Sequence, residues 1–154
     1  MLNESERERD ERFMNMALQE AEAAYEEGEI PVGAVIVSNG RVIARGHNLT
    51  ETLHDVTAHA EMIALTAACN NLGGKYLPKC TIYVTVEPCT MCAGALGWSQ
   101  IGRIVYGAPD PKRGFFTSTR PEQTPIHPKT IVEGGLLADE ASTLMKAFFS
   151  RLRK

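Results

Sequence analysis

Four residues in two short motifs could support metal-assisted chemistry. His59 and Glu61 stand two residues apart, and Cys89 and Cys92 lie in the segment Glu87-Pro88-Cys89-Thr90-Met91-Cys92. One imidazole and two thiols provide three zinc ligands, one fewer than a closed structural site requires. The fourth position would be left to water, and a carboxylate that is not a ligand can move protons to and from that water. These residue types therefore predict a zinc hydrolase.

The spacing of each motif is typical of the start of a helix. Residues i and i+2 point about 200° apart around a helix, so His59 and Glu61 cannot meet one metal ion in the middle of a helix. Beyond a helix N-terminus both side chains can reach the same point, and Thr57 is available as a cap. Cys89 and Cys92 would share one face of a second helix start. The positive ends of two helix dipoles would then favour anionic thiolates at the metal.

The hydrophobic pattern predicts an α/β chain that holds both motifs at helix starts. Helical periodicity favours four helices, over residues 6–27, 59–72, 89–99 and 139–151. Apolar and β-branched runs favour five strands, over residues 32–37, 41–47, 81–86, 103–106 and 129–133. Asn39-Gly40 predicts a hairpin between the first two strands, and loops are expected over residues 48–58 and 109–128. Strands that alternate with helices indicate a mixed sheet covered by helices on both faces.

Length and composition indicate one domain. The chain has 154 residues, of which 44% are hydrophobic, so we expect residues 1–154 to form a single domain around one core. It shows no signal peptide and no apolar run near ~20 residues, which predicts no membrane span. Four cysteines in such a chain indicate a reducing, cytoplasmic location. Cys69 and Cys80, which lie outside the metal motif, are expected to be buried core residues.

The charge distribution is uneven along the chain. The net charge is −3, which by itself argues mildly against a nucleic-acid ligand. Residues 1–30 carry three Arg and ten acidic residues, whereas the rest of the chain has a net charge of +4. The charged residues from Lys146 onward are all basic: Lys146, Arg151, Arg153 and Lys154. These cations either favour the dipole of the last helix or contact phosphates.

Six segments, taken with the two motifs, resemble bacterial tRNA adenosine deaminases. They are residues 28–37, 46–48, 54–61, 89–95, 101–107 and 135–149, which together extend over nearly the whole chain. H-x-E followed by P-C-x-x-C is the signature of zinc nucleobase deaminases. The resemblance implies a three-layer α/β/α cytidine deaminase-like fold with a five-stranded sheet of order 2-1-3-4-5. It also implies conversion of the wobble adenosine of a tRNA anticodon stem-loop to inosine and ammonia, by a homodimer with one Zn²⁺ per chain.

The same resemblance implies roles for individual residues. The zinc ligands would be His59, Cys89 and Cys92. Glu61 would shuttle protons between water and the base. Asn48 would contact a purine flipped out of the anticodon loop, beside the backbone of Ala60, and Asp110 would lie near the substrate backbone. The apolar wall of the pocket would consist of Ile30, Pro31 and Val32. Residues 113–121 depart from the family pattern, so no substrate contact is carried over to them.

The last predicted helix would supply further RNA contacts. Helical spacing places Phe148 on a core stripe with Leu144 and Leu152, and turns Phe149 about 100° away from that stripe. Phe149 is therefore the better candidate to stack on a base, and Arg151 is a candidate phosphate ligand.

Two other functions remain open. The segment Gly94-Ala95-Leu96-Gly97-Trp98 resembles the same helix in guanine deaminases, so a deaminase of guanine or another free base or nucleotide is the alternative. In either enzyme Trp98 would be a core or dimer-interface aromatic. A non-catalytic zinc-binding domain is also possible, but it would have no use for Glu61 beside an open ligand position. The remaining histidines are expected to be structural: His47, His54 and His127.

Overall fold

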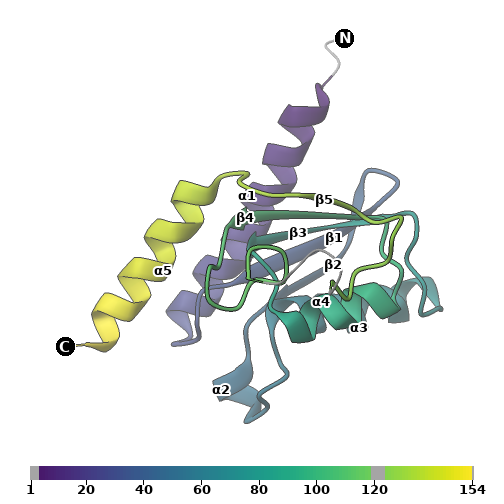
Figure 1. Cartoon of the computed structure of the whole chain (residues 1–154). Helices are drawn as coiled ribbons and strands as arrows, with labels where there is room; N and C mark the ends of the chain where they lie inside the picture. Colours follow the sequence, from purple (N-terminus) through teal and green to yellow (C-terminus); the bar gives the residue numbers. More distant parts are fainter. Residues whose placement is uncertain (1–3, 119–123, 154) are drawn as a thin grey trace.

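The computed structural model describes residues 4–118 and 124–153, and its five strands form one sheet (Figure 1). Lys154 and residues 119–121 therefore lie outside the described residues. The elements are α1 (Glu6–Glu26), β1 (Gly33–Ser38), β2 (Arg41–His47), α2 (Thr50–Leu53), α3 (Ala60–Leu72), β3 (Cys80–Val86), α4 (Thr90–Trp98), β4 (Arg103–Ala108), β5 (Ile131–Glu133) and α5 (Ala138–Leu152). The strand order is β2-β1-β3-β4-β5, as predicted. β1 is antiparallel to β2 and β3, whereas β3, β4 and β5 are parallel.

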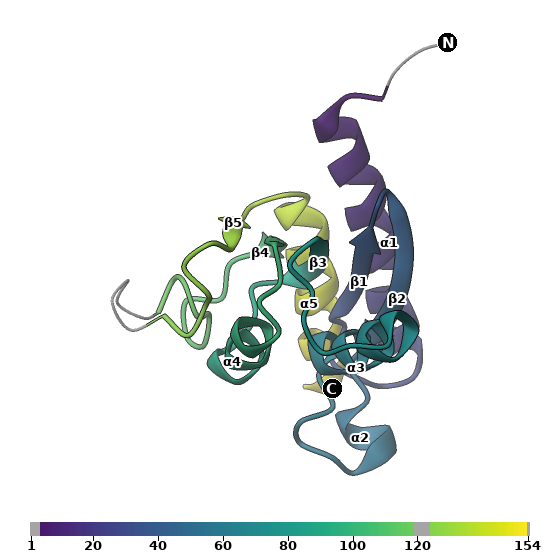
Figure 2. The same ribbon diagram turned by 90° about the vertical axis from the view of Figure 1, so that its right-hand side faces the viewer.

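Helices cover both faces of the sheet, which confirms the three-layer fold. On one face, Phe13 and Met14 of α1 pack against Val35 and Tyr83, and α5 joins this layer through Ala141. On the other face, α3 and α4 lie side by side (Figures 1 and 2). The apolar residues buried between these two helices and the sheet include Ala60, Ala64, Ala68, Leu96, Ile36, Ile82, Val84 and Ile104. The small side chains of α3 let this helix approach the strands closely.

One edge of the sheet collects the strand ends that carry the predicted site. Parallel pairing sets Val86 of β3 opposite Ala108 of β4. Because β1 is antiparallel to both neighbours, β2 also ends at this edge. A Cβ atom at Gly46 would overlap the carbonyl group of Ala60, so this glycine permits the start of α3 to lie against β2. The loops after β2, β3 and β4 therefore meet the N-termini of α3 and α4, as at the ligand-binding edge of many α/β sheets.

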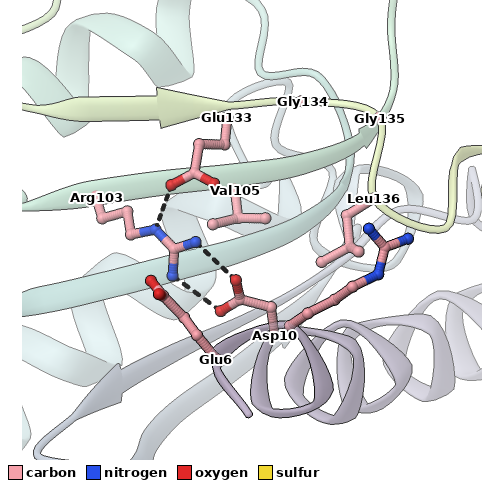
Figure 3. A pocket seen from close by; sticks show the side chains of 9 residues that line it. Glu6, Asp10, Arg103, Val105, Glu133, Gly134, Gly135 and Leu136 are labelled. Carbon is pink, nitrogen blue, oxygen red and sulfur yellow. Dashed lines mark hydrogen bonds and ion pairs between the residues drawn. The ribbon is translucent and has the colours of Figure 1, made fainter.

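A partly buried ion pair joins α1 to β4 near the start of that strand (Figure 3). The Asp10 carboxylate lies 2.7 Å from Nη2 of Arg103 and accepts a hydrogen bond from the Tyr83 hydroxyl at 2.6 Å. Nε of Arg103 donates to Glu133 of β5 at 2.8 Å. Hydrogen bonding to Arg103 holds the pKa of Asp10 below its usual value, although burial opposes this. A hollow of about 400 Å³ beside the network is lined by Glu6 and by four charged residues that form ion pairs, Arg7, Asp10, Arg103 and Glu133, and none of the predicted site residues lines it.

The structure corrects several expectations. Residues 50–53, expected as loop, form α2, which projects away from the layers (Figure 2). The fifth strand covers only Ile131–Glu133, and Leu152 is exposed because the last turn of α5 extends past the sheet. Cys80 is buried as expected, whereas Cys69 is only half-buried.

Among the described helices, none is both long and apolar enough to cross a bilayer.

Candidate active site

His59, Cys89 and Cys92 converge at the edge where α3 and α4 begin. Nδ1 of His59 lies 3.7 Å from Sγ of Cys89 and 3.5 Å from Sγ of Cys92. Around a tetrahedral zinc ion, ordinary Zn–N and Zn–S bond lengths place the nitrogen and sulfur ligands about 3.5 Å apart. Within residues 4–118 and 124–153, this is the only group of three or more His, Cys, Asp or Glu residues whose ligand atoms all lie within 4.8 Å of one another. The trio therefore fits zinc without rearrangement.

Two of the three side chains stand at helix N-caps. His59 is the N-cap of α3 and Cys89 is the N-cap of α4, both with extended backbone, and neither side chain caps its own helix. The side chains are thus free to bind a metal beyond the helix ends. The prediction that Thr57 caps α3 is wrong, because the hydroxyl and the N–H of Thr57 both donate hydrogen bonds to Asp55. The dipoles of α3 and α4 converge on the trio and favour negative charge there.

The two thiols share hydrogen bonds that polarise them. Hydrogen bonding by the Cys92 thiol lowers the pKa of Cys89 to about 4, with further help from His59 and against the effect of burial. The same contact raises the pKa of Cys92, which acts as the donor. Metal binding displaces protons from thiols, so a divalent cation would favour the ionised form of both.

Glu61 lies in the first turn of α3 and is almost completely buried. Burial, with a smaller contribution from the negative charge of Cys89, raises its pKa to about 7. Among the described side chains, its Oε1 is the only buried oxygen or nitrogen without a hydrogen-bond partner. A buried carboxylate oxygen that lacks a hydrogen-bond partner destabilises the fold unless a bound ligand or water supplies the missing hydrogen bond. This orphaned atom beside three ligands fits a metal site that also binds water.

The mouth of the site is basic. A hollow of about 410 Å³ is lined by Val56, His59, Cys89, Thr90, Met91, Lys112, Arg113 and Ser118. Lys112 and Arg113 stand on the loop after β4, where Oδ1 of Asp110 accepts hydrogen bonds from both of their N–H groups. The sequence prediction missed these two cations, although their adjacency shortly after Asp110 was a visible signal. Asp110 itself holds this turn.

The predicted base-binding residues form a neighbouring group. The Asn48 N–H donates to the Val32 carbonyl at 3.2 Å, and the next N–H along the chain donates to Ala58, one residue before His59. Nδ2 of Asn48 faces Glu29 at 3.4 Å and Thr50 at 3.3 Å. The residues predicted around the base differ in exposure: Pro31 and Ala60 are buried, Val32 is half-buried, and Ile30 is exposed. None of them lines the basic hollow.

The predicted RNA contacts on α5 lie elsewhere. Phe148 is buried as expected, and Phe149 is 37% exposed. The Arg151 guanidinium lies 4.2 Å from the centroid of the Tyr25 ring and donates to the Tyr25 carbonyl at 3.2 Å. Arg151 thus fastens α5 to the end of α1, and neither it nor Phe149 lines the hollow.

The other polar groups near this edge have structural partners. His47 is held between Glu20 and Glu27, His54 ends α2 in the left-handed region, and His127 accepts a hydrogen bond from the Lys129 N–H, so none joins the trio. The sequence prediction did not single out Glu29 and Glu87, two buried carboxylates that hold loops on either side of the site. Glu29 lies shortly before an apolar strand and Glu87 directly after one. This position beside a buried strand was the signal that the sequence offered.

Comparison with known proteins agrees with this geometry. The family model for the cytidine and deoxycytidylate deaminase zinc-binding region matches residues 7–108. The tRNA-specific adenosine deaminase of Bacillus subtilis (strain 168) is 45% identical over 148 residues, which cover 94% of this chain and 91% of that protein. A solved tRNA:A34 deaminase, studied for A-to-I editing at the wobble position, has a TM-score of 0.80 at 46% identity, over 86% of this chain and 98% of its own. The guanine deaminase of Nitrosomonas europaea has a TM-score of 0.73 at 25% identity, over 97% of this chain and 87% of its own. The chain therefore belongs to the cytidine and deoxycytidylate deaminase family and, within it, to the tRNA-specific adenosine deaminases.

Proposed function

We propose that the protein hydrolyses the wobble adenosine of a tRNA anticodon stem-loop to inosine and ammonia. One zinc ion per chain is held by His59, Cys89 and Cys92. The observation that carries the proposal is the orphaned buried oxygen of Glu61 beside this trio. A purely structural zinc site has no use for such a carboxylate.

The chain's residues divide the work of the reaction. When bound, zinc lowers the pKa of water and stabilises negative charge. Glu61 would take a proton from the attacking water and deliver it to N1 of the adenine ring, and would then carry the proton of the new C6 hydroxyl to the departing amine, so that inosine and ammonia result. Asn48 keeps its Nδ2 on Glu29 and Thr50, which leaves its Oδ1 to accept a hydrogen bond from the substrate. The backbone of Ala60 and the apolar residues Ile30, Pro31 and Val32 bound the base.

The basic mouth supports RNA as the substrate rather than a free base. A nucleotide flipped out of a loop brings neighbouring phosphates with it, whereas guanine brings none. Lys112 and Arg113 stand at the rim, beside His59 and Cys89, where such phosphates would pass. Phe149 is exposed on α5 and is an outlying stacking candidate.

We further propose that the chain acts as one deaminase domain, as a homodimer and in the cytoplasm. Trp98, at the end of α4, is 85% exposed, which excludes a core role within one chain. Tyr76 is 52% exposed and lines the same hollow as Trp98, and such apolar surface is typical of an interface. A homodimer should sediment at twice the monomer mass at micromolar concentration, and Trp98→Ala should shift it toward monomer.

The decisive experiment is incubation of the purified protein with total bacterial tRNA, followed by sequencing of the anticodons. Inosine is read as guanosine, so editing appears as an A-to-G change at the wobble position. Glu61→Gln protein is the matched control. Efficient turnover of guanine together with unedited tRNA would replace this proposal with the free-base alternative.

A further inference from the structure

A single buried side chain holds the loop that carries the rim cations. Glu87, the residue after β3, is 3% exposed. Its Oε1 accepts hydrogen bonds from the Asp110 N–H at 2.9 Å and from the Thr117 hydroxyl at 2.6 Å. Its Oε2 accepts from the N–H groups of Phe116 and Thr117, both at 2.8 Å. Four donors on two oxygens suit an ionised carboxylate, which can only accept.

Further contacts join the loop of residues 110–117 to the segment that contains Cys89. The Phe115 N–H donates to the Pro88 carbonyl at 3.0 Å, and Gly114 forms an antiparallel bridge with Cys89. A Cβ atom at Gly114 would overlap the Glu87 carboxylate, so the loop backbone lies directly on this side chain. The loop is therefore fixed relative to the metal-binding segment by Glu87 and by the backbone beside it.

We propose that Glu87 is a positioning residue for the deamination. It holds residues 110–117 in the arrangement that places Lys112 and Arg113 at the mouth of the pocket, and it acts through this loop rather than on the substrate. The inference rests on the proposed function for its kinetic consequence only. Its structural consequence, a loop ordered by one carboxylate, can be measured without any substrate.

Glu29 provides a matched comparison on the other side of the site. It is fully buried, and its Oε2 accepts hydrogen bonds from the N–H and the hydroxyl of Thr52 at 2.7 and 2.6 Å. Burial opposes ionisation of Glu29, but the hydrogen bonds from Thr52 more than offset it and lower its pKa. Like Glu87, Glu29 accepts hydrogen bonds from the N–H and the hydroxyl of one threonine, but the loop that it holds is residues 48–53.

The test compares Glu87→Gln with Glu29→Gln by amide hydrogen exchange and by kinetics. Glu87→Gln replaces one acceptor oxygen with an amide NH2 group that faces N–H donors, so exchange should accelerate across residues 110–117. It should be unchanged there in Glu29→Gln. The KM for an anticodon stem-loop should rise in Glu87→Gln on the order of tenfold, the effect of losing about one hydrogen bond to a charged group. The kcat at saturating RNA should change less than about threefold, and zinc content should stay at the wild-type level.

Two milder substitutions keep the proposal testable if Glu87→Gln or Glu29→Gln fails to fold. Thr117→Val removes one donor to Glu87, and Thr52→Val removes the equivalent donor to Glu29. Thr117→Val should raise KM in the same direction by a smaller factor. Unchanged exchange at residues 110–117 in Glu87→Gln, or a fall in kcat with KM unchanged, overturns the proposal. A wild-type protein that leaves tRNA unedited contradicts the proposed function instead, and the exchange data still decide whether Glu87 orders the loop.

Discussion

At the residue scale, the metal trio makes a direct prediction. Replacement of both thiols in Cys89→Ser/Cys92→Ser leaves one imidazole, which cannot hold zinc at ordinary affinity. We expect zinc, measured by elemental analysis, to fall from about one per chain to near zero. Cys69→Ser is the matched control, because Cys69 is a half-buried thiol on α3 outside the trio. Zinc retained in the double variant would contradict the ligand assignment.

Glu61 permits a second residue-scale prediction. Glu61→Gln preserves the volume of the side chain but removes its capacity to carry a proton. We expect turnover of an anticodon stem-loop to fall on the order of 10²-fold or more, with folding and zinc content retained. Single-turnover assays at saturating RNA measure this effect. Loss of zinc in the variant would identify Glu61 as a ligand, and near-normal turnover would remove its role as proton shuttle.

The residues predictable from the sequence were those whose types and spacing carry the chemistry. His59, Cys89 and Cys92 could be selected as candidate ligands, and the structure brings them together, because a metal needs a defined set of ligands that short motifs can supply. Lys112 and Glu87 were not identified, because their roles depend on how an irregular loop folds back onto the segment after β3. A charged residue in a turn is usually exposed to solvent. An irregular loop has no periodic pattern from which its position beside a pocket could be predicted.

At the element scale, His47 joins the end of β2 to α1. Burial alone would lower the pKa of His47, but hydrogen bonds to the carboxylates of Glu20 and Glu27 outweigh burial and raise it. A raised pKa stabilises the folded state below the ordinary value for histidine, and this contribution is lost as pH rises through the raised value. The difference in unfolding free energy between the wild type and His47→Gln should therefore shrink from pH 6 to pH 9. Urea denaturation across this range measures it, and a difference that grows with pH would contradict the attachment.

The long elements could be predicted because their buried faces repeat over several turns or pleats. The α1 stripe of Phe13 and Ala17 and the run of β1 are examples, and Asn39-Gly40 correctly marked the hairpin, with both residues at positive φ. The four residues of α2 are too few for a periodic pattern, so the sequence predicted loop. Leu152 fits the apolar stripe of α5 by spacing alone. It is exposed because spacing does not tell how far the supporting layer extends.

At the scale of the whole molecule, the question is which basic surface binds the RNA. The acidic N-terminal part of the chain gives the protein its net charge of −3, so binding must rely on local cations. The sequence favoured Arg151 of α5 as a phosphate ligand. In the structure, the Arg151 guanidinium instead contacts the ring and the carbonyl of Tyr25. Lys112 and Arg113 instead flank the predicted ligands His59 and Cys89.

Lys112→Ala/Arg113→Ala should therefore weaken tRNA binding and flatten its salt dependence by about two units of log–log slope, one for each lost phosphate contact. The kcat at saturating RNA should change far less, because neither cation moves a proton. Filter binding from low to moderate salt measures the slope. Arg7→Ala is the matched control, since Arg7 is a strongly exposed cation on α1 that lies by the Asp10–Arg103 network instead of the mouth. If Arg151→Ala flattens the slope and the double variant does not, RNA binds along α5. The exposed face of Phe149 would then continue the binding surface away from the pocket.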